Sequence, residues 1–151
     1  MLETGVDALR EPEVPFSTYP TAIVAVVLWH QGRMALLKRS GRVHHDTGMW
    51  HCVTGYLEAS SSPRQQAVQE ILEETGLAPS DLRGFAEGPV IDLTDETGAA
   101  WRVHTFRAEV LQHRLTLNWE HDVYQWVAPA RIGAFGHVAW LSQIIHALDA
   151  A

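Results

Sequence analysis

The sequence contains little cysteine, little positive charge and no long apolar run. Cys52 is the only cysteine, which excludes an intramolecular disulfide and is typical of a protein from a reducing compartment. No apolar run approaches the roughly 20 residues that a membrane-spanning helix needs. Residues 1–20 mix acidic residues, prolines and an arginine without an apolar centre, so we expect no secretory signal peptide there. These features predict a cytoplasmic protein without a membrane partner.

The charge balance excludes a second class of partner. The chain has 11 Lys and Arg residues against 18 Asp and Glu residues, a net charge of −7, which argues against binding to nucleic acid polymers. Its 151 residues are 46% hydrophobic and 19% charged, as in an ordinary globular protein with one core. We expect one domain over residues 20–151, preceded by an N-terminal arm over residues 1–19.

Apolar patterning predicts a sheet with two helices. Residues 21–29 are almost continuously aliphatic, which predicts a strand buried on both faces, and a tight turn at Gln31-Gly32 returns the chain as a second strand. Helical spacing of apolar residues predicts a C-terminal helix within residues 129–150. Further strands are expected over residues 50–54, 82–93 (interrupted at Gly88-Pro89), 101–110 and 123–127. The order of elements predicts an α/β fold, an α/β/α sandwich with a mixed sheet.

The most informative stretch runs from Gly55 to Leu77. It passes from a glycine through a serine-rich turn into a short helix. Ser62 is a good N-cap, Pro63 suits the first helical position, and Gln65 completes a capping box. Gly76 ends the helix. The predicted apolar stripe consists of Ala67, Val68, Ile71 and Leu72.

Three glutamates, Glu70, Glu73 and Glu74, stand three and four residues apart on this helix, and we expect them on one patch of its surface. Like charges at this spacing destabilise a helix by about 0.2–0.5 kcal/mol per pair. A solvated acidic face would explain them, and so would a divalent cation. Mg²⁺ takes oxygen ligands and leaves room for substrate phosphates, so it suits the second explanation.

This stretch resembles the Nudix box, G-x5-E-x7-R-E-U-x-E-E-x-G-U, in which U is a bulky aliphatic residue. The first glutamate of the box is replaced by Ser61 and the arginine by Gln69. Because both charges are absent together, neither is left unpaired, but an arginine that would help to hold Glu70 is missing. The matching positions are Gly55, Glu70, Ile71, Glu73, Glu74, Gly76 and Leu77.

The resemblance implies the Nudix fold and Mg²⁺-dependent hydrolysis, with Mn²⁺ as an alternative ion. The substrate would be a small molecule with a phosphoanhydride bond, either a nucleoside diphosphate linked to another group or a nucleoside or pterin triphosphate. The general base would be Glu70 or Glu120, and Glu73 would assist in coordination or proton transfer. The implied metal ligands are the Gly55 carbonyl, Glu70, Glu73, Glu74 and Glu120.

Segments outside the helix sharpen the resemblance. Residues 50–58 and 120–126 are similar to segments of bacterial dihydroneopterin triphosphate pyrophosphatases. By resemblance, Arg39 and Lys38 would contact phosphate. Trp50 or Trp119 could stack on a base or pterin ring. Specificity is expected to depend on the loops over residues 40–48, 94–99 and 112–122.

Other features stay open or are given ordinary roles. Ser61 and Gln69 favour an alternative, a Nudix-fold binding module with little turnover. The segment His44-His45-Asp46 is interpreted as a surface loop, and Cys52 as a strand residue. Both the substrate and the oligomeric state, including a homodimer, are left open.

Overall fold

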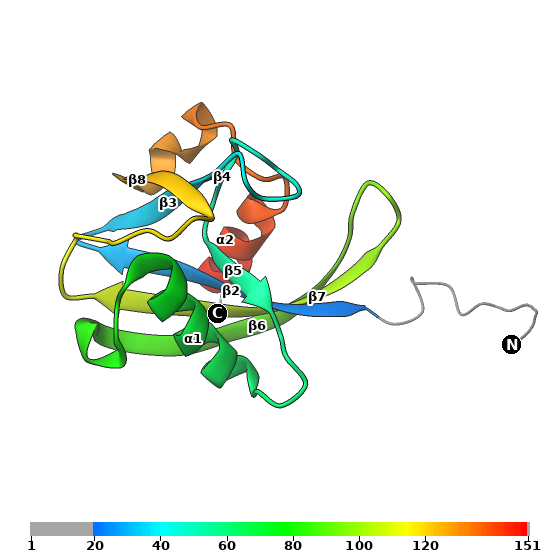
Figure 1. The fold of residues 1–151 in the computed structure, drawn as a ribbon, viewed down its shortest axis with the longest axis horizontal. Helices are drawn as coiled ribbons and strands as arrows, with labels where there is room; N and C mark the ends of the chain where they lie inside the picture. The colour runs from blue at the N-terminus through cyan, green and yellow to red at the C-terminus, as the bar shows by residue number, and fades with distance from the viewer. Residues whose placement is uncertain (1–19, 151) are drawn as a thin grey trace, which may run out of the picture.

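The computed structural model describes residues 20–150, which form a mixed seven-stranded sheet with one helix on each face (Figure 1). The predicted α/β/α sandwich is therefore confirmed. The arm expected over residues 1–19 lies outside the described residues. The strands are β2 (Thr21–His30), β3 (Arg33–Arg39), β4 (Trp50–His51), β5 (Val53–Tyr56), β6 (Leu82–Thr94), β7 (Ala100–Val110) and β8 (His121–Val127). The helices are α1 (Pro63–Thr75) and α2 (Leu141–Ala150), with short 3-10 helices over Pro79–Asp81 and Pro129–Ala134.

Strand β2 is the centre of the sheet and pairs with three others. It runs parallel to β7 and antiparallel to β3 and β5. Strand β3 continues the sheet to β4 and β8, while β6 pairs antiparallel with β7. The hairpin that we expected around Gln31-Gly32 is the β2–β3 pair.

The side chains of β2 alternate between two cores. One set packs with α2 and the other with α1, which is why this strand needs apolar residues at consecutive positions. The set facing α2 consists of Ile23, Ala25, Val27 and Trp29. The set facing α1 consists of Val24, Val26 and Leu28.

Helix α1 begins and ends where its capping residues predict. The Ser62 hydroxyl accepts a hydrogen bond from the Gln65 backbone N–H (3.1 Å), and the Gln65 side chain accepts one from the Ser62 N–H (3.0 Å). Gly76 adopts φ +75°, a left-handed conformation that suits glycine, and its N–H donates to the Leu72 carbonyl.

The buried face of α1 differs from the predicted stripe. Ala67 and Ile71 are buried, but Leu72 is 46% exposed. The face against the sheet continues instead through Gln66 and Glu74. Consecutive helical residues differ by about 100°, so Leu72 turns away when Ile71 faces the core.

Several strand boundaries also differ from the sequence prediction. The single strand expected over residues 50–54 is two, because β4 pairs with β3 and β5 pairs with β2. Strand β6 continues through Gly88-Pro89 with a bulge between Glu87 and Val90. Strand β8 begins at His121, two residues before the predicted start.

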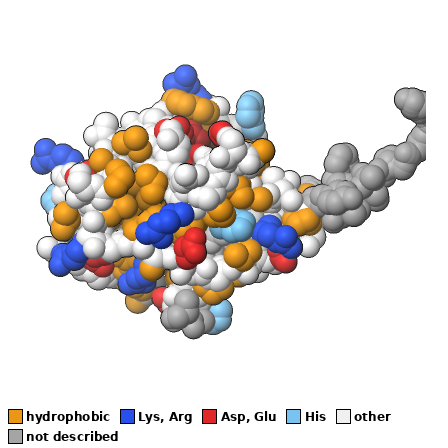
Figure 2. Space-filling view, turned by 90° about the horizontal axis from the view of Figure 1, so that it is seen from below, with side chains coloured by type: hydrophobic (Ala, Val, Ile, Leu, Met, Phe, Trp, Pro, Cys, Tyr) orange, Lys and Arg blue, Asp and Glu red, His pale blue; other side chains and the backbone are white. Residues whose placement is uncertain are grey.

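The surface shown in Figure 2 carries Lys, Arg, Asp and Glu side chains interspersed with apolar ones. Both signs of charge therefore occur on this face, despite the net charge of −7. Among the residues described, no helix is both long enough and apolar enough to cross a membrane.

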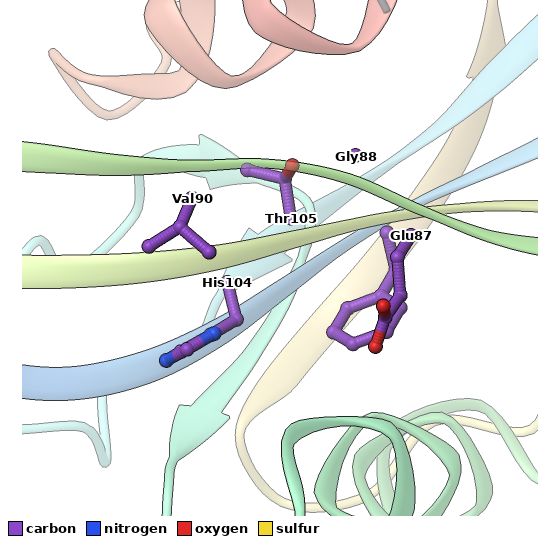
Figure 3. Close-up of a pocket in the computed structure, with 6 residues that line it drawn as sticks. Glu87, Gly88, Val90, His104 and Thr105 are labelled. Carbon is purple, nitrogen blue, oxygen red and sulfur yellow. The ribbon is translucent and has the colours of Figure 1, made fainter.

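The bulge in β6 depends on a glycine. Figure 3 shows Gly88 beside Thr105, at a small pocket of about 50 Å³. The Thr105 hydroxyl donates to the Pro89 carbonyl (2.6 Å), so its position is fixed. A Cβ on Gly88 would lie 2.6 Å from both Thr105 Oγ1 and Leu148 Cδ2. A larger side chain fits there only if the Thr105 or Leu148 side chain moves.

We therefore predict that Gly88→Ala lowers the free energy of unfolding by about 1–3 kcal/mol, as overpacking of a core does. Gly84→Ala is the matched control on the same strand, since a Cβ there meets no atom within 4 Å. Its effect should stay within about 0.5 kcal/mol. Urea unfolding curves of both variants would measure the difference, and equal effects would contradict the role given to the bulge.

Candidate active site

A cleft of about 540 Å³ opens at one end of the sheet. Each of the three loops expected to set specificity contributes to its walls, through Asp46, Thr97 and Glu120 among others. Backbone hydrogen bonds between Trp50 and residues 136 and 138 bring the segment before α2 to the same cleft. The full lining is Ile23, Arg39, His45, Asp46, Met49, His51, Thr54, Gly55, Tyr56, Asp95, Glu96, Thr97, Trp101, Glu120, Val138, Ala139 and Trp140.

Glu74 does not line this cleft but is buried, with a relative exposure of 1%, near Thr54 and Glu120, which do line it. Among residues 20–150, neither of its carboxylate oxygens has a hydrogen-bond partner. Burial raises its pKa well above the ordinary value, and the neighbouring carboxylates Glu120 and Glu70 raise the pKa further. An unpartnered buried carboxylate destabilises a fold, so its presence indicates a functional reason for keeping it.

Glu70 lies against Gly55 at the wall of the cleft. A Cβ at Gly55 would lie 2.1 Å from the carboxyl carbon of Glu70, so only glycine leaves room for this side chain. Burial also raises the pKa of Glu70, and the charges of Glu73 and Glu120 add to the effect. The Gln66 side chain, which donates a hydrogen bond to Glu70, acts in the opposite direction and lowers this pKa.

Gln66 holds Glu70 in place and was not predicted. Its Nε2 donates to Glu70 Oε2 (2.8 Å), and its Oε1 accepts from the Glu58 backbone N–H (3.2 Å). It is 3% exposed. The sequence suggested that replacing the box arginine with Gln69 would leave Glu70 unsupported. The structure provides Gln66 for this purpose, while Gln69 donates to Glu73.

The three helix glutamates do not share one surface patch, contrary to our expectation. Glu70 and Glu74 are four residues apart and face β5, whereas Glu73 is exposed. Within residues 20–150, no set of three or more His, Cys, Asp and Glu side chains is arranged to hold a metal ion. The side chains brought together are the Glu70–Glu74 pair, with Glu120 nearby.

Glu120 comes from the loop before β8. Its carboxylate accepts from the Asn118 side-chain amide (3.1 Å), and its backbone N–H donates to Asn118 Oδ1 (3.0 Å). The loop is tied to β3, because the Ser40 N–H donates to the Glu120 carbonyl (2.8 Å). This anchoring brings a loop residue to the box helix, which lies more than 40 positions earlier in the chain.

Two buried histidines lie near these carboxylates. His121 Nδ1 is 3.9 Å from Glu74 Oε1. Burial lowers the pKa of His121 to about 4, and the charge of Arg39 contributes. Burial also lowers the pKa of His51 to about 3, followed by the charges of Arg39, His121, His137 and His45. Both imidazoles are therefore neutral at pH 7.

The other residues expected to bind substrate divide into two groups. Arg39 lines the cleft, and its Nε donates to the His45 carbonyl (3.1 Å). Lys38 and Trp50 do not line it, and Trp50 packs edge-on against Phe135 with ring centroids 5.1 Å apart. Trp119 is 51% exposed and also lies outside the lining.

The segment His44-His45-Asp46 and Cys52, which the sequence analysis interpreted as a surface loop and a strand residue, match these roles only in part. His45 and Asp46 contact each other at 3.2 Å in an exposed loop, and both reach the cleft. Cys52 lies between β4 and β5 rather than in a strand, and it is buried in the core under α2. Burial raises the pKa of its thiol, which disfavours the thiolate that a nucleophile needs.

A family model described as the NUDIX domain matches residues 18–148, most of the chain. The chain belongs to the Nudix hydrolase family. Nudix hydrolases generally use divalent metal ions, and the box alignment on Gly55 agrees with this membership. The residues from Gly55 to Leu77 thus form the Nudix box of this protein.

Solved Nudix structures share the fold. The NUDIX domain of Shewanella oneidensis NrtR, complexed with ADP-ribose, is similar with a TM-score of 0.73 and 16% identity, over 87% of this chain and 88% of that one. The E. coli dihydroneopterin triphosphate pyrophosphohydrolase is similar with a TM-score of 0.71 and 18% identity, over 86% of this chain and 96% of that one. A Nudix hydrolase from Nitrosomonas europaea is similar with a TM-score of 0.72 and 22% identity, over 87% of this chain and 90% of that one.

One protein with a similar sequence has a description that does not mention the Nudix family. A protein from Myxococcus xanthus described as an octanoyltransferase is 40% identical to this Nudix chain over 87 residues. The match covers 53% of this chain and only 23% of that protein. The chain thus spans less than a quarter of its relative's length.

Sequence reasoning missed five residues of the site. Gln66 had a readable signal, because it precedes Glu70 by four residues on a helix and can contact it. His51, Tyr56, Trp101 and Trp140 had none. Their convergence depends on how β4, β5, β7 and the segment before α2 are placed in three dimensions.

Gln66→Met tests how Glu70 is positioned. The change keeps the volume but removes the hydrogen bonds to Glu70 and to the Glu58 N–H, so we expect about tenfold lower hydrolase activity. Gln69→Met is the matched control, since it removes a similar contact on the exposed side of α1. Steady-state kinetics should show little change for the control. Equal losses of activity in the two variants would mean that a general disturbance of α1, and not the position of Glu70, causes the effect.

His51 gives the fold a pH dependence. Its folded pKa of about 3 is below the ordinary value of 6.5, so the unfolded chain binds a proton that the folded chain does not. This destabilisation is absent above pH 6.5 and grows as the pH falls towards 3, by up to about 1.4 kcal/mol per pH unit. In His51→Asn, the loss of unfolding free energy between pH 7.5 and 5 should be smaller than in the wild type. Urea unfolding at both pH values measures this loss. An identical loss in the wild type and the variant would contradict the prediction that His51 is buried and neutral.

Proposed function

We propose that the domain over residues 20–151 is a Mg²⁺-dependent pyrophosphohydrolase. Its substrate would be a nucleoside diphosphate linked to another group, or a nucleoside or pterin triphosphate. The observation that carries this proposal is the buried Glu74 carboxylate, whose oxygens have no hydrogen-bond partner among residues 20–150 and which lies near Glu70 and Glu120. The likeness to the E. coli dihydroneopterin triphosphate pyrophosphohydrolase and to a domain complexed with ADP-ribose supports the substrate class.

The donor set fits Mg²⁺. This ion is commonly bound through one or two carboxylates together with waters and substrate phosphates, so a cage of three side chains is not required. Glu70 and Glu74 would hold it, with the Gly55 carbonyl and Glu120 completing the oxygen donors. Glu73 faces solvent, and we give it no ligand role. A bound Mg²⁺ would neutralise phosphate charge and lower the pKa of the attacking water.

The residues of the chain would divide the remaining work. Arg39 lines the cleft and supplies positive charge to the phosphates. Although the resemblance also allows Glu120 as a metal ligand, we assign it the role of general base instead, because it lines the cleft, whereas Glu70 is held by Gln66. The water oxygen forms a bond to phosphorus, and its proton passes to Glu120. The bond from phosphorus to the bridging oxygen breaks, and that oxygen leaves with the electron pair as a phosphate.

The alternative is a binding module that holds such a compound without turnover. The neutral Ser61 and Gln69 in the Nudix box favour it. The buried Glu74 disfavours it, because a carboxylate without hydrogen bonds destabilises a fold that has no use for it.

Hydrolysis with Mg²⁺ tests the proposal on dihydroneopterin triphosphate, each dNTP, ADP-ribose and NADH. We expect turnover of at least one, abolished by EDTA and reduced at least about 100-fold in Glu74→Gln. Glu74→Gln should melt at a higher temperature than the wild type in EDTA, since it removes a buried carboxylate, so its inactivity will not reflect unfolding. Glu87→Gln, an exposed glutamate of β6, is the control.

A second variant tests the base. Glu120→Gln should lower kcat at least about 100-fold, while Mg²⁺ still protects the protein against thermal unfolding. If the folded wild type binds Mg²⁺ but hydrolyses none of the panel, the binding module replaces the enzyme.

A further inference from the structure

Buried side-chain polar atoms without a hydrogen-bond partner are concentrated in one part of the fold. Among residues 20–150 there are seven such atoms, and six of them are the two polar atoms on each of Glu74, His121 and His51. The large majority of buried side-chain polar atoms in folded proteins are paired, so an unpaired cluster needs an explanation.

Glu74 and His121 face each other within this cluster. His121 Nδ1 lies 3.9 Å from Glu74 Oε1, and the two side chains are 2% and 1% exposed. This distance is longer than a hydrogen bond, but a movement of about 1 Å by either side chain brings the two atoms into hydrogen-bonding range. An imidazole can donate from Nδ1 both as a neutral tautomer and as an imidazolium, so the contact does not require a change of protonation.

The backbone fixes His121 at this place. It is the first residue of β8 and pairs with Arg39 of β3, next to an irregularity in the register of the two strands. The preceding residue, Glu120, accepts a hydrogen bond from the Ser40 N–H (2.8 Å). The imidazole therefore extends from an anchored strand end into the interior, where it meets the box helix.

The other carboxylate of the pair already has a side chain that supports it. Gln66 Nε2 donates to Glu70 Oε2 (2.8 Å), which fixes the orientation of that carboxylate. Glu74 has no hydrogen bond of this kind among residues 20–150, and the imidazole of His121 is a donor beside it. Carboxylates that bind a metal ion are themselves hydrogen-bonded, and these outer contacts orient them.

We propose that His121 is a positioning residue for Glu74: its Nδ1–H donates to Oε1 and leaves the other carboxylate oxygen for the metal ion. The inference rests on the proposed function in taking Glu74 to be a ligand of that ion. His121 itself is not a ligand, because Mg²⁺ prefers oxygen donors. The imidazole and the ion together would satisfy both oxygens of a buried carboxylate.

Mn²⁺ titration of the full chain, followed by electron paramagnetic resonance, measures metal affinity without substrate or turnover. His121→Phe and His121→Gln should weaken Mn²⁺ binding at least about tenfold, because Phe has no donor and Gln carries its amide near the place of Nε2. His121→Asn carries its amide near the place of Nδ1 and should stay within about threefold of the wild type. A packing role predicts the reverse order, since Gln is closer to His in volume than Asn is.

His30→Phe is the matched control. His30 is half-buried at the end of β2, its Nδ1 donates to the Val110 carbonyl (3.1 Å), and it does not line the cleft. Loss of this histidine hydrogen bond should leave the Mn²⁺ affinity unchanged.

A measurement on the wild type keeps the test valid if the His121 variants do not fold. In ¹⁵N NMR spectra recorded with Mg²⁺, the proposal predicts a proton on Nδ1 of His121. A ring that carries its proton on Nε2 alone would overturn it, because Nδ1 could then not donate to Glu74.

The outcomes separate this inference from the proposed function. Mn²⁺ affinity that falls in His121→Phe and His121→Gln but not in His121→Asn, in a protein that hydrolyses none of the panel, would support the inference and overturn the hydrolase. Hydrolysis by the wild type, with unchanged metal affinity in His121→Phe and His121→Gln, would support the hydrolase and overturn the inference. Equal losses in all three His121 variants would also overturn it, since the effect would then be one of packing. A wild type that binds no Mn²⁺ would overturn both.

Discussion

The burial of one carboxylate, Glu74, is the constraint on which the arrangement of the site depends. Glu74 can approach the sheet only because α1 packs directly on β5 and β2, and the capping of α1 by Ser62 and Gly76 sets which face it presents. Gly55 then has to lack a side chain, since Glu70 occupies the adjacent space. Gln66 secures Glu70 from the other side. A helix shifted by one residue would turn all these groups away from the cleft.

The two replacements in the Nudix box show how a charged support can be exchanged for a neutral one. With Ser61 and Gln69 the helix loses two opposite charges, and the amide of Gln66 takes over the contact with Glu70. An amide spans the two groups by donating to Glu70 and accepting from Glu58. Because it is neutral, it adds no charge to a region where the Glu120 carboxylate already raises the pKa of both Glu70 and Glu74.

Local signals account for what the sequence predicted well. The limits of α1 followed from Ser62, Pro63 and Gly76, and the central position of β2 followed from its continuous apolar run, because both depend on neighbours in the chain. The exposure of Leu72 and the burial of Glu74 depend on the angle at which α1 lies on the sheet, which helical spacing alone does not define. The meeting of Tyr56, Trp101 and Trp140 in the cleft lining depends on contacts between distant segments, such as Trp50 with residues 136–138. No pattern along the chain records these contacts.

The turn joining β6 and β7 lies at one end of a long hairpin, whereas the bulge at Gly88 packs the middle of that hairpin against α2. The part of the hairpin that lines the cleft and the part that packs against α2 are therefore separate. Glu96 in this turn belongs to neither core, whereas Asp95 accepts a hydrogen bond from Trp101, which packs against the core under α2. During evolution, the range of compounds accepted by this scaffold can thus change while the box helix stays the same.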